Sequence, residues 1–192
     1  TTEGRPGEVQ GRMDRHCAEI LRNFHKLVPD QLMSGGEEID TAIGRLQVLW
    51  TPCHSPGHIC LYCPEQKLLF SGDLILEKIT PNIAWIPERD TLAEFLASLD
   101  GLVDLEIDLI LPSHGPPFEG HREWIAQTKD HHRQRCDEIH GLLNTSPDTA
   151  YALVAKLWTR KLSPINHHFA VLEVMAHLEY MQRQGRVHSE AD

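Results

Sequence analysis

Three short apolar runs lie between residues 44 and 72, and they constrain the fold more than any other feature of the sequence. They are GRLQVLW at 44–50, HICLYC at 58–63 and KLLFSG at 67–72, and the turn PEQ separates the last two. Apolar residues recur at every second position of the first run, which is the period of a β-strand. The three runs therefore predict neighbouring strands of one sheet.

Downstream, the pattern alternates between helix and strand. TLAEFLASLDGL at 91–102 carries apolar residues at helical spacing, with Thr91 as its expected N-terminal cap. IDLILPSHG at 107–115 predicts a short apolar strand that ends in a loop. Strands alternating with helices predict an α/β fold in which helices cover the sheet.

The two ends of the chain differ in sequence pattern from the segment between them. Residues 1–35 predict a polar lead-in and a weak helix, with apolar spacing at Cys17, Ile20, Leu21 and Phe24, and SGGEEID at 34–40 predicts a turn. From Glu119 onward three helical segments follow, at 122–143, 149–160 and 167–186, and no strand is expected. We therefore expect an α/β domain over 1–118 and a helical extension over 119–192.

Composition narrows the class of protein. The chain has 192 residues, a formal net charge of −10 and no apolar run near the roughly 20 residues of a membrane span. The negative charge argues against general nucleic-acid binding. Five cysteines, an odd number, and a polar N-terminus without a signal-peptide core favour reduced thiols in the cytoplasm.

Polar residues with metal-binding chemistry follow three of the predicted strands. His54 lies in a proline-flanked turn after the first strand, Asp73 follows the third, and His114 follows the strand near 110. Rigid sheets position the loops at their strand ends, and imidazole with carboxylate suits zinc, iron or manganese. Taken singly, each histidine could be a solvated surface residue, and the aspartate a turn former.

The order of the motifs TPCHSPGH (51–58), FSGD (70–73) and LPSHG (111–115) is a much rarer coincidence. Over residues 35–118 the chain resembles the second half of a metallo-β-lactamase-fold hydrolase. The resemblance implies the second half of an αββα sandwich. The helical tail is similar to the small winged-helix-like appendage that some members of the family carry.

The resemblance also implies roles for individual residues. His54 would bind the first of two metal ions, Asp73 would bridge both ions as the catalytic carboxylate, and His114 would bind the second. His58 would orient these ligands without binding metal. The implied ions are zinc, with iron or manganese as alternatives, and the implied reaction is hydrolysis of a small-molecule ester, thioester, lactone or amide by metal-activated water.

Two departures from the family are expected to matter. None of the thirteen histidines begins the H-x-H-x-D-H segment that supplies ligands in the family's first half, and fewer than 45 residues precede the first strand. Three ligands cannot hold a dinuclear centre, so we expect a truncated chain, inactive and without metal unless the missing N-terminal half or another fragment is a partner. Cys53 stands where the family usually has glycine, and its thiolate is an additional candidate ligand.

The sequence also allows other functions. One is a non-catalytic remnant, and another is a nucleic-acid-binding module in the tail, where residues 151–188 carry five Lys or Arg against two Glu. Cys60 and Cys63 are spaced as C-x-x-C, but a strand would point them to opposite faces. The basic side chains near His131 and His132 favour a solvated helix face over a phosphate contact; they are Arg122, Lys129, Arg133 and Arg135. A homo-oligomer is a further alternative.

Overall fold

The computed structural model describes residues 28–53, 55–78 and 81–189. The chain divides into Thr1–Leu32 and Met33–Asp192. Of the first unit only residues 28–32 are described, as exposed chain without helix or strand. The predicted N-terminal helix and His54 lie outside the described residues. The described helices and strands all belong to the second unit.

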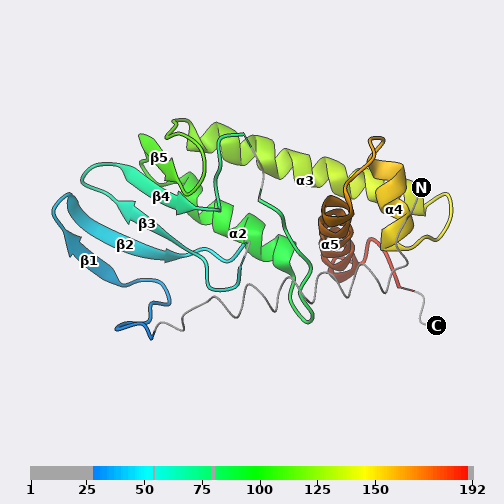
Figure 1. Ribbon diagram of the computed structural model, residues 1–192, viewed down its shortest axis with the longest axis horizontal. Helices are drawn as coiled ribbons and strands as arrows, with labels where there is room; N and C mark the ends of the chain where they lie inside the picture. Colours follow the sequence, from blue (N-terminus) through cyan, green and yellow to red (C-terminus); the bar gives the residue numbers. More distant parts are fainter. Residues whose placement is uncertain (1–27, 54, 79–80, 190–192) are drawn as a thin grey trace. The chain divides into compact units, whose positions relative to one another are not determined.

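A five-stranded sheet lies at one end of this unit, with the last two described helices at the other end (Figure 1). Its strands lie in sequence order, with the first four antiparallel and the last two parallel. They are β1 (Glu38–Thr41), β2 (Gly44–Trp50), β3 (Ile59–Cys63), β4 (Leu68–Gly72) and β5 (Leu109–Pro112). The α/β class and four of these strands confirm the sequence prediction.

Strand β1 was not predicted, because three of its four residues, 38–40, fall inside the expected turn at 34–40. The turn ends at Glu37, whose carboxylate accepts hydrogen bonds from the backbone amides of Ser34 and Gly35 at 2.8 Å each. The strand that follows is polar and lies at the sheet edge, where Arg45 of β2 pairs with Glu38 at 3.0 Å. An exposed edge strand has no apolar alternation to reveal it.

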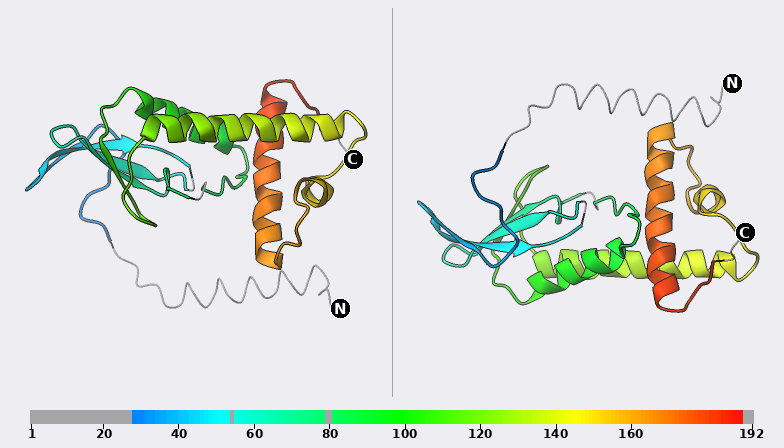
Figure 2. Two further views of the ribbon diagram at one scale, coloured as in Figure 1. Left: turned by 90° about the horizontal axis from the view of Figure 1, so that it is seen from above. Right: turned by 90° about the horizontal axis from the view of Figure 1, so that it is seen from below.

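Two helices cover one face of the sheet. Helix α2 (Thr91–Val103) connects β4 to β5, and α3 (His121–Leu143) follows β5; Figure 2 shows both on the same side of the strands. The predicted cap at Thr91 is wrong by one residue, because the Asp90 carboxylate accepts from the Ala93 amide at 3.0 Å. An aspartate at this position satisfies an amide that the helix leaves unpaired.

The helical extension contributes α4 (Ala150–Leu157) and α5 (Pro164–Arg183), which confirms the predicted helices. Thr149 and Ser163 cap them through their hydroxyl oxygens. Within the described part of the chain, no strand follows residue 112, and no helix is long and apolar enough to cross a membrane.

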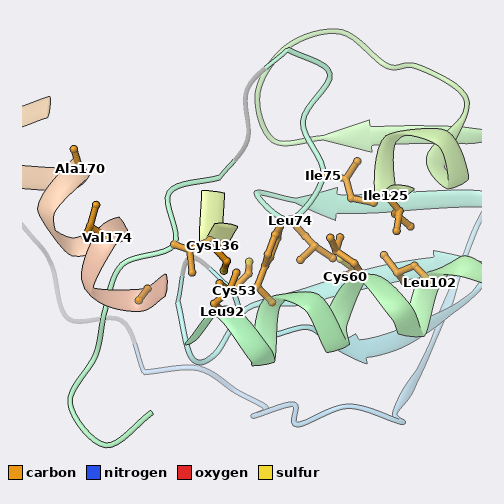
Figure 3. Packing of buried hydrophobic residues seen from close by; sticks show 14 of the residues in the cluster. Cys53, Cys60, Leu74, Ile75, Leu92, Leu102, Ile125, Cys136, Ala170 and Val174 are labelled. Carbon is orange, nitrogen blue, oxygen red and sulfur yellow. The ribbon is translucent and has the colours of Figure 1, made fainter. Parts of the chain in front are cut away.

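The sheet and the four helices of the described residues share one apolar core. Figure 3 shows Cys60 of β3 and Leu74 beside the face of α2 that carries Leu92 and Leu102, and α5 contributes residues such as Val174 to the same cluster. Full burial of each such aliphatic side chain stabilises the fold by about 1.5–3 kcal/mol. Residues 119–189 are therefore packed into the same core as the sheet.

The opposite face of the sheet is largely apolar. Beside Thr41 and Gly44, the register places eleven apolar residues on it and no charged one: Ile39, Leu46, Val48, Trp50, Ile59, Leu61, Cys63, Leu68, Phe70, Leu109 and Leu111. Leu61, Phe70 and Leu111 lie side by side across three strands and are only partly buried. Described helices cover the other face alone, so this one has the composition of a surface that packs against further protein.

Two buried histidines join α3 to α5. His132 Nδ1 lies 3.1 Å from His177 Nε2, and His177 Nδ1 donates to the Glu173 carbonyl at 2.8 Å. Because a carbonyl only accepts, His177 carries its proton on Nδ1, and His132 must donate to its Nε2. Because its Nε2 accepts and its Nδ1 donates, the His177 imidazole is neutral in the core.

This pair predicts an acid-sensitive fold. Burial lowers the pKa of His132 to about 3 and that of His177 to about 4, from an ordinary value of 6.5. Below about pH 6.5 the unfolded chain binds protons that the folded chain does not. The free energy of unfolding should then fall toward pH 4 by about 1.4 kcal/mol per pH unit for each imidazole.

The measurement is urea unfolding between pH 7 and pH 4.5. His177→Gln, which keeps an acceptor for His132, should reduce the slope by about 1.4 kcal/mol per pH unit. His168→Gln, a change at an exposed histidine of α5, is the matched control and should leave the slope unchanged. Equal slopes for all three proteins would show that the pair titrates normally.

Candidate metal centre

The parallel pairing of β4 with β5 brings two of the predicted ligands together. Gly72 is the register partner of Pro112, and the Ser113 amide donates to the Gly72 carbonyl at 3.0 Å. The residues that follow each strand therefore meet at one edge of the sheet. His114 Nε2 lies 3.6 Å from Asp73 Oδ1, and the Ser113 hydroxyl donates to the same oxygen.

The loop that carries His114 is closed by the backbone. Ile110 and Phe118 exchange two hydrogen bonds, of 2.8 and 3.1 Å, across residues 111–117. The His114 side chain is 71% exposed, and Asp73 is 34% exposed. Both groups are thus held at their base and open to solvent at their tips, as metal ligands in an accessible site need to be.

The segment that contains His54 is anchored on both sides. The Thr51 amide donates to the His58 carbonyl at 3.0 Å, and the His58 amide donates to the Ser55 carbonyl at 3.2 Å. From helix α2, the Ser98 hydroxyl donates to the Pro52 carbonyl at 3.0 Å. His54 itself lies outside the described residues, so its role stays a prediction.

His58 contacts the backbone of Asp73. The Asp73 amide donates to His58 Nε2 at 3.1 Å, while His58 Nδ1 lies 3.1 Å from the Thr51 carbonyl and 3.0 Å from its hydroxyl. One ring nitrogen therefore touches the candidate ligand and the other touches the preceding loop. This is the arrangement that an orienting residue requires.

Gly72 makes room for that contact. Its φ of +53° is in the left-handed region, and a Cβ atom there would lie 2.4 Å from His58 Nε2. Any side chain at position 72 would displace the imidazole as well as strain the backbone.

The donor set suits a metal ion. A carboxylate oxygen and an imidazole nitrogen converge at one exposed point, and zinc, iron and manganese accept both. Within the described ranges no group of three His, Cys, Asp or Glu residues is assembled. Asp73 and His114 would therefore supply two donors to a metal ion, and a metal centre at this point would need further ligands.

Cys53, the additional candidate, is only 6% exposed and belongs to the apolar core cluster. Its packing favours a structural role over metal binding. The C-x-x-C spacing is confirmed as part of strand β3: Cys60 faces the helices, and the Cys63 thiol lies 3.7 Å from the Ile43 carbonyl. Cys60, Cys63 and Cys136 are free thiols.

The basic side chains of α3 have partners within the chain. Arg122 donates to the Val103 and Leu105 carbonyls at 2.9 and 3.0 Å, where α2 ends. The other three contact acidic residues; they are Lys129 with Asp100, Arg133 with Asp130, and Arg135 with Glu138. These partners within the chain indicate that the four basic side chains belong to an ordinary folded surface.

Comparison with known proteins extends the match beyond the motifs. Residues 2–114 match the family model of the metallo-β-lactamase superfamily. The chain belongs to the metallo-β-lactamase superfamily. Residues 136–192 match a second model, the metallo-β-lactamase-like C-terminal domain, so the helical extension is also shared with relatives.

Individual members of the superfamily align with much of the chain. A β-lactamase-like protein 2 homologue from Caenorhabditis elegans is 28% identical over 84% of this chain and 53% of its own length. Acyl-coenzyme A thioesterase MBLAC2 from Gallus gallus is 32% identical over 62% of this chain and 41% of its own. A metallo-β-lactamase family protein from Thermus thermophilus is 33% identical, with a TM-score of 0.79 over 91% of this chain and 56% of its own.

The chain therefore spans about half the length of the relatives it matches.

The sequence indicated roles for Asp73, His114 and His58 but none for Thr51, Gly72 or Ser113. All three stand inside the quoted motifs, close to the residues that were assigned.

The Gly72 contact predicts a large effect of a small change. Gly72→Ala should lower the free energy of unfolding by about 2–4 kcal/mol, because left-handed strain adds to the clash with His58. The check is chemical unfolding beside Gly141→Ala, where a Cβ on helix α3 meets nothing within 4 Å. That control should gain about 0.5–1 kcal/mol. A neutral Gly72→Ala would show that the strand end has no such close contact.

Proposed function

We propose that this protein is a metal-dependent hydrolase that cleaves the thioester or ester bond of a small molecule. The observation that supports this most is the approach of Asp73 and His114 to 3.6 Å at the ends of two parallel strands. Membership of the metallo-β-lactamase superfamily also supports a hydrolase function for this site.

The proposed metal ligands are His54, Asp73 and His114, with Asp73 as the bridging carboxylate. Zinc is the proposed ion, and iron or manganese would accept the same donors. A bound ion would supply an activated water and polarise the substrate carbonyl. His58 fixes the Asp73 backbone, and the Ser113 hydroxyl donates to Asp73 Oδ1, so both contacts limit the directions in which the carboxylate can point.

The thioester class is favoured among the substrates that the superfamily accommodates. The support is the 32% identity to an acyl-coenzyme A thioesterase. Esters, lactones and amides share the same carbonyl chemistry and are the alternatives to be compared in the same assay.

We also propose that further polypeptide completes the site by packing on the apolar face of the sheet. The eleven apolar side chains on that face and the roughly half-length match to relatives support this. In this arrangement residues 1–118 form part of the metal-binding domain, and 119–192 form a helical extension similar to a winged helix.

Metal affinity tests the ligand assignment. The chain is titrated with cobalt(II) by visible absorption and with zinc by competition. Asp73→Asn and His114→Ala should each weaken binding by about tenfold or more, because each removes a direct donor. His168→Ala changes an exposed histidine of α5 and should bind as the wild type does. Equal affinity of all four proteins, or uptake well below one equivalent by the wild type, would favour a non-catalytic remnant.

Hydrolysis tests the reaction. The zinc-loaded protein is incubated with an acyl-coenzyme A and with a matched oxygen ester, both as this chain and as a longer protein that includes the polypeptide proposed to complete the site. The released coenzyme A and acid are measured by chromatography. Turnover by the longer protein should require zinc, should disappear in Asp73→Asn and should favour the thioester, whereas this chain alone should show none. Metal binding by the longer protein with no hydrolysis of either compound would overturn the proposed reaction and leave the metal centre intact.

A further inference from the structure

We propose that Thr51 and Cys60 are positioning residues for Asp73, acting through His58 in a closed ring of hydrogen bonds. The proposal rests on the proposed function only in treating Asp73 as a metal ligand. The ring itself is a property of the described side chains.

The direction of each hydrogen bond in the ring follows from the Ser71 carbonyl, where the series ends. The Ser71 carbonyl can only accept, so the Cys60 thiol donates to it at 3.4 Å. The sulfur then has only lone pairs to offer, and it accepts from the Thr51 hydroxyl at 3.3 Å. Burial supports this assignment, since it raises the pKa of Cys60 to about 12 and keeps the thiol protonated.

The direction of the Thr51 hydrogen bond determines which ring nitrogen of His58 carries the proton. The single hydroxyl proton of Thr51 is directed to sulfur, so its oxygen can only accept from His58 Nδ1, 3.0 Å away. His58 therefore carries its proton on Nδ1, shared with the Thr51 carbonyl at 3.1 Å. Its Nε2 is left as the acceptor that the Asp73 amide requires at 3.1 Å.

The series of hydrogen bonds begins and ends on the same short segment of the polypeptide. It starts at the Asp73 amide and ends at the Ser71 carbonyl, with only Gly72 between them. This is the point at which the register of β4 against β5 shifts. Because every donor in the ring has an acceptor, the bonds reinforce one another and hold the strand end in one conformation.

Cys60 is suited to this position by size and burial. The thiol is fully buried, spans two bonds of 3.3–3.4 Å and keeps its proton at neutral pH. Cys63 provides the contrast on the same strand, since its thiol is equally buried but points to the Ile43 carbonyl away from the ring. The two cysteines therefore form a natural pair of test and control.

The experiment follows the Asp73 amide by NMR in the full chain. Cys60→Ala should speed hydrogen exchange of this amide on the order of tenfold relative to the Ile110 amide, whose bond to Phe118 lies outside the ring. Cys60→Ser keeps a donor and an acceptor and should stay within about threefold of the wild type. Cys63→Ala should leave the ratio unchanged, and the imidazole nitrogen shifts of wild-type His58 should show the proton on Nδ1.

If Cys60→Ala does not fold, Thr51→Val breaks the same ring from the other side and should give the same loss. An Asp73 amide that is unaffected by both changes, an equal effect of Cys63→Ala, or a His58 proton on Nε2 would overturn the proposal. Zinc affinity separates it from the proposed function. Binding that weakens about tenfold in Cys60→Ala supports both proposals. Absence of zinc binding in the wild type defeats the proposed function alone, because the amide measurement needs no metal.

Discussion

The parallel pairing of β4 with β5 is the constraint on which the candidate site depends. In a parallel pair both carboxyl ends lie at the same edge of the sheet, so residues far apart in sequence become neighbours. Asp73 and His114 meet there, and Ser113 bonds to both the backbone of Gly72 and the carboxylate of Asp73. The crossover that makes the pairing parallel is the segment containing α2, whose apolar face is buried under the sheet.

The loop before β3 reaches the same edge from the other side. His58 fits against Gly72 because that residue has no side chain, and it then receives the Asp73 amide. Three loops thus converge on one spot, each tied by backbone hydrogen bonds to a strand of one rigid sheet. The helical extension adds to this rigidity, since α5 joins the same core and the Leu172 carbonyl accepts from the Trp85 amide in the long loop that follows Asp73.

The fold was largely predictable because its apolar periodicities are strong. Strands β2 to β5 and helices α2 to α5 have buried faces that the sequence displays, whereas β1 is an exposed polar edge and was missed. The order of the motifs predicted that Asp73 and His114 belong together. Their hydrogen-bond partners were not predictable, because Thr51 and Cys60 act through side-chain directions that depend on the register of β2 against β3. A one-residue slip would have pointed Cys60 to the other face.

We propose that Asp73 and His114 bind the same metal ion, and a crystal structure of the zinc-loaded protein with anomalous data at the zinc edge would show whether they do. We expect one zinc within about 2.0–2.2 Å of both an Asp73 oxygen and a His114 ring nitrogen. Zinc bound elsewhere, with these two side chains turned apart, would contradict it.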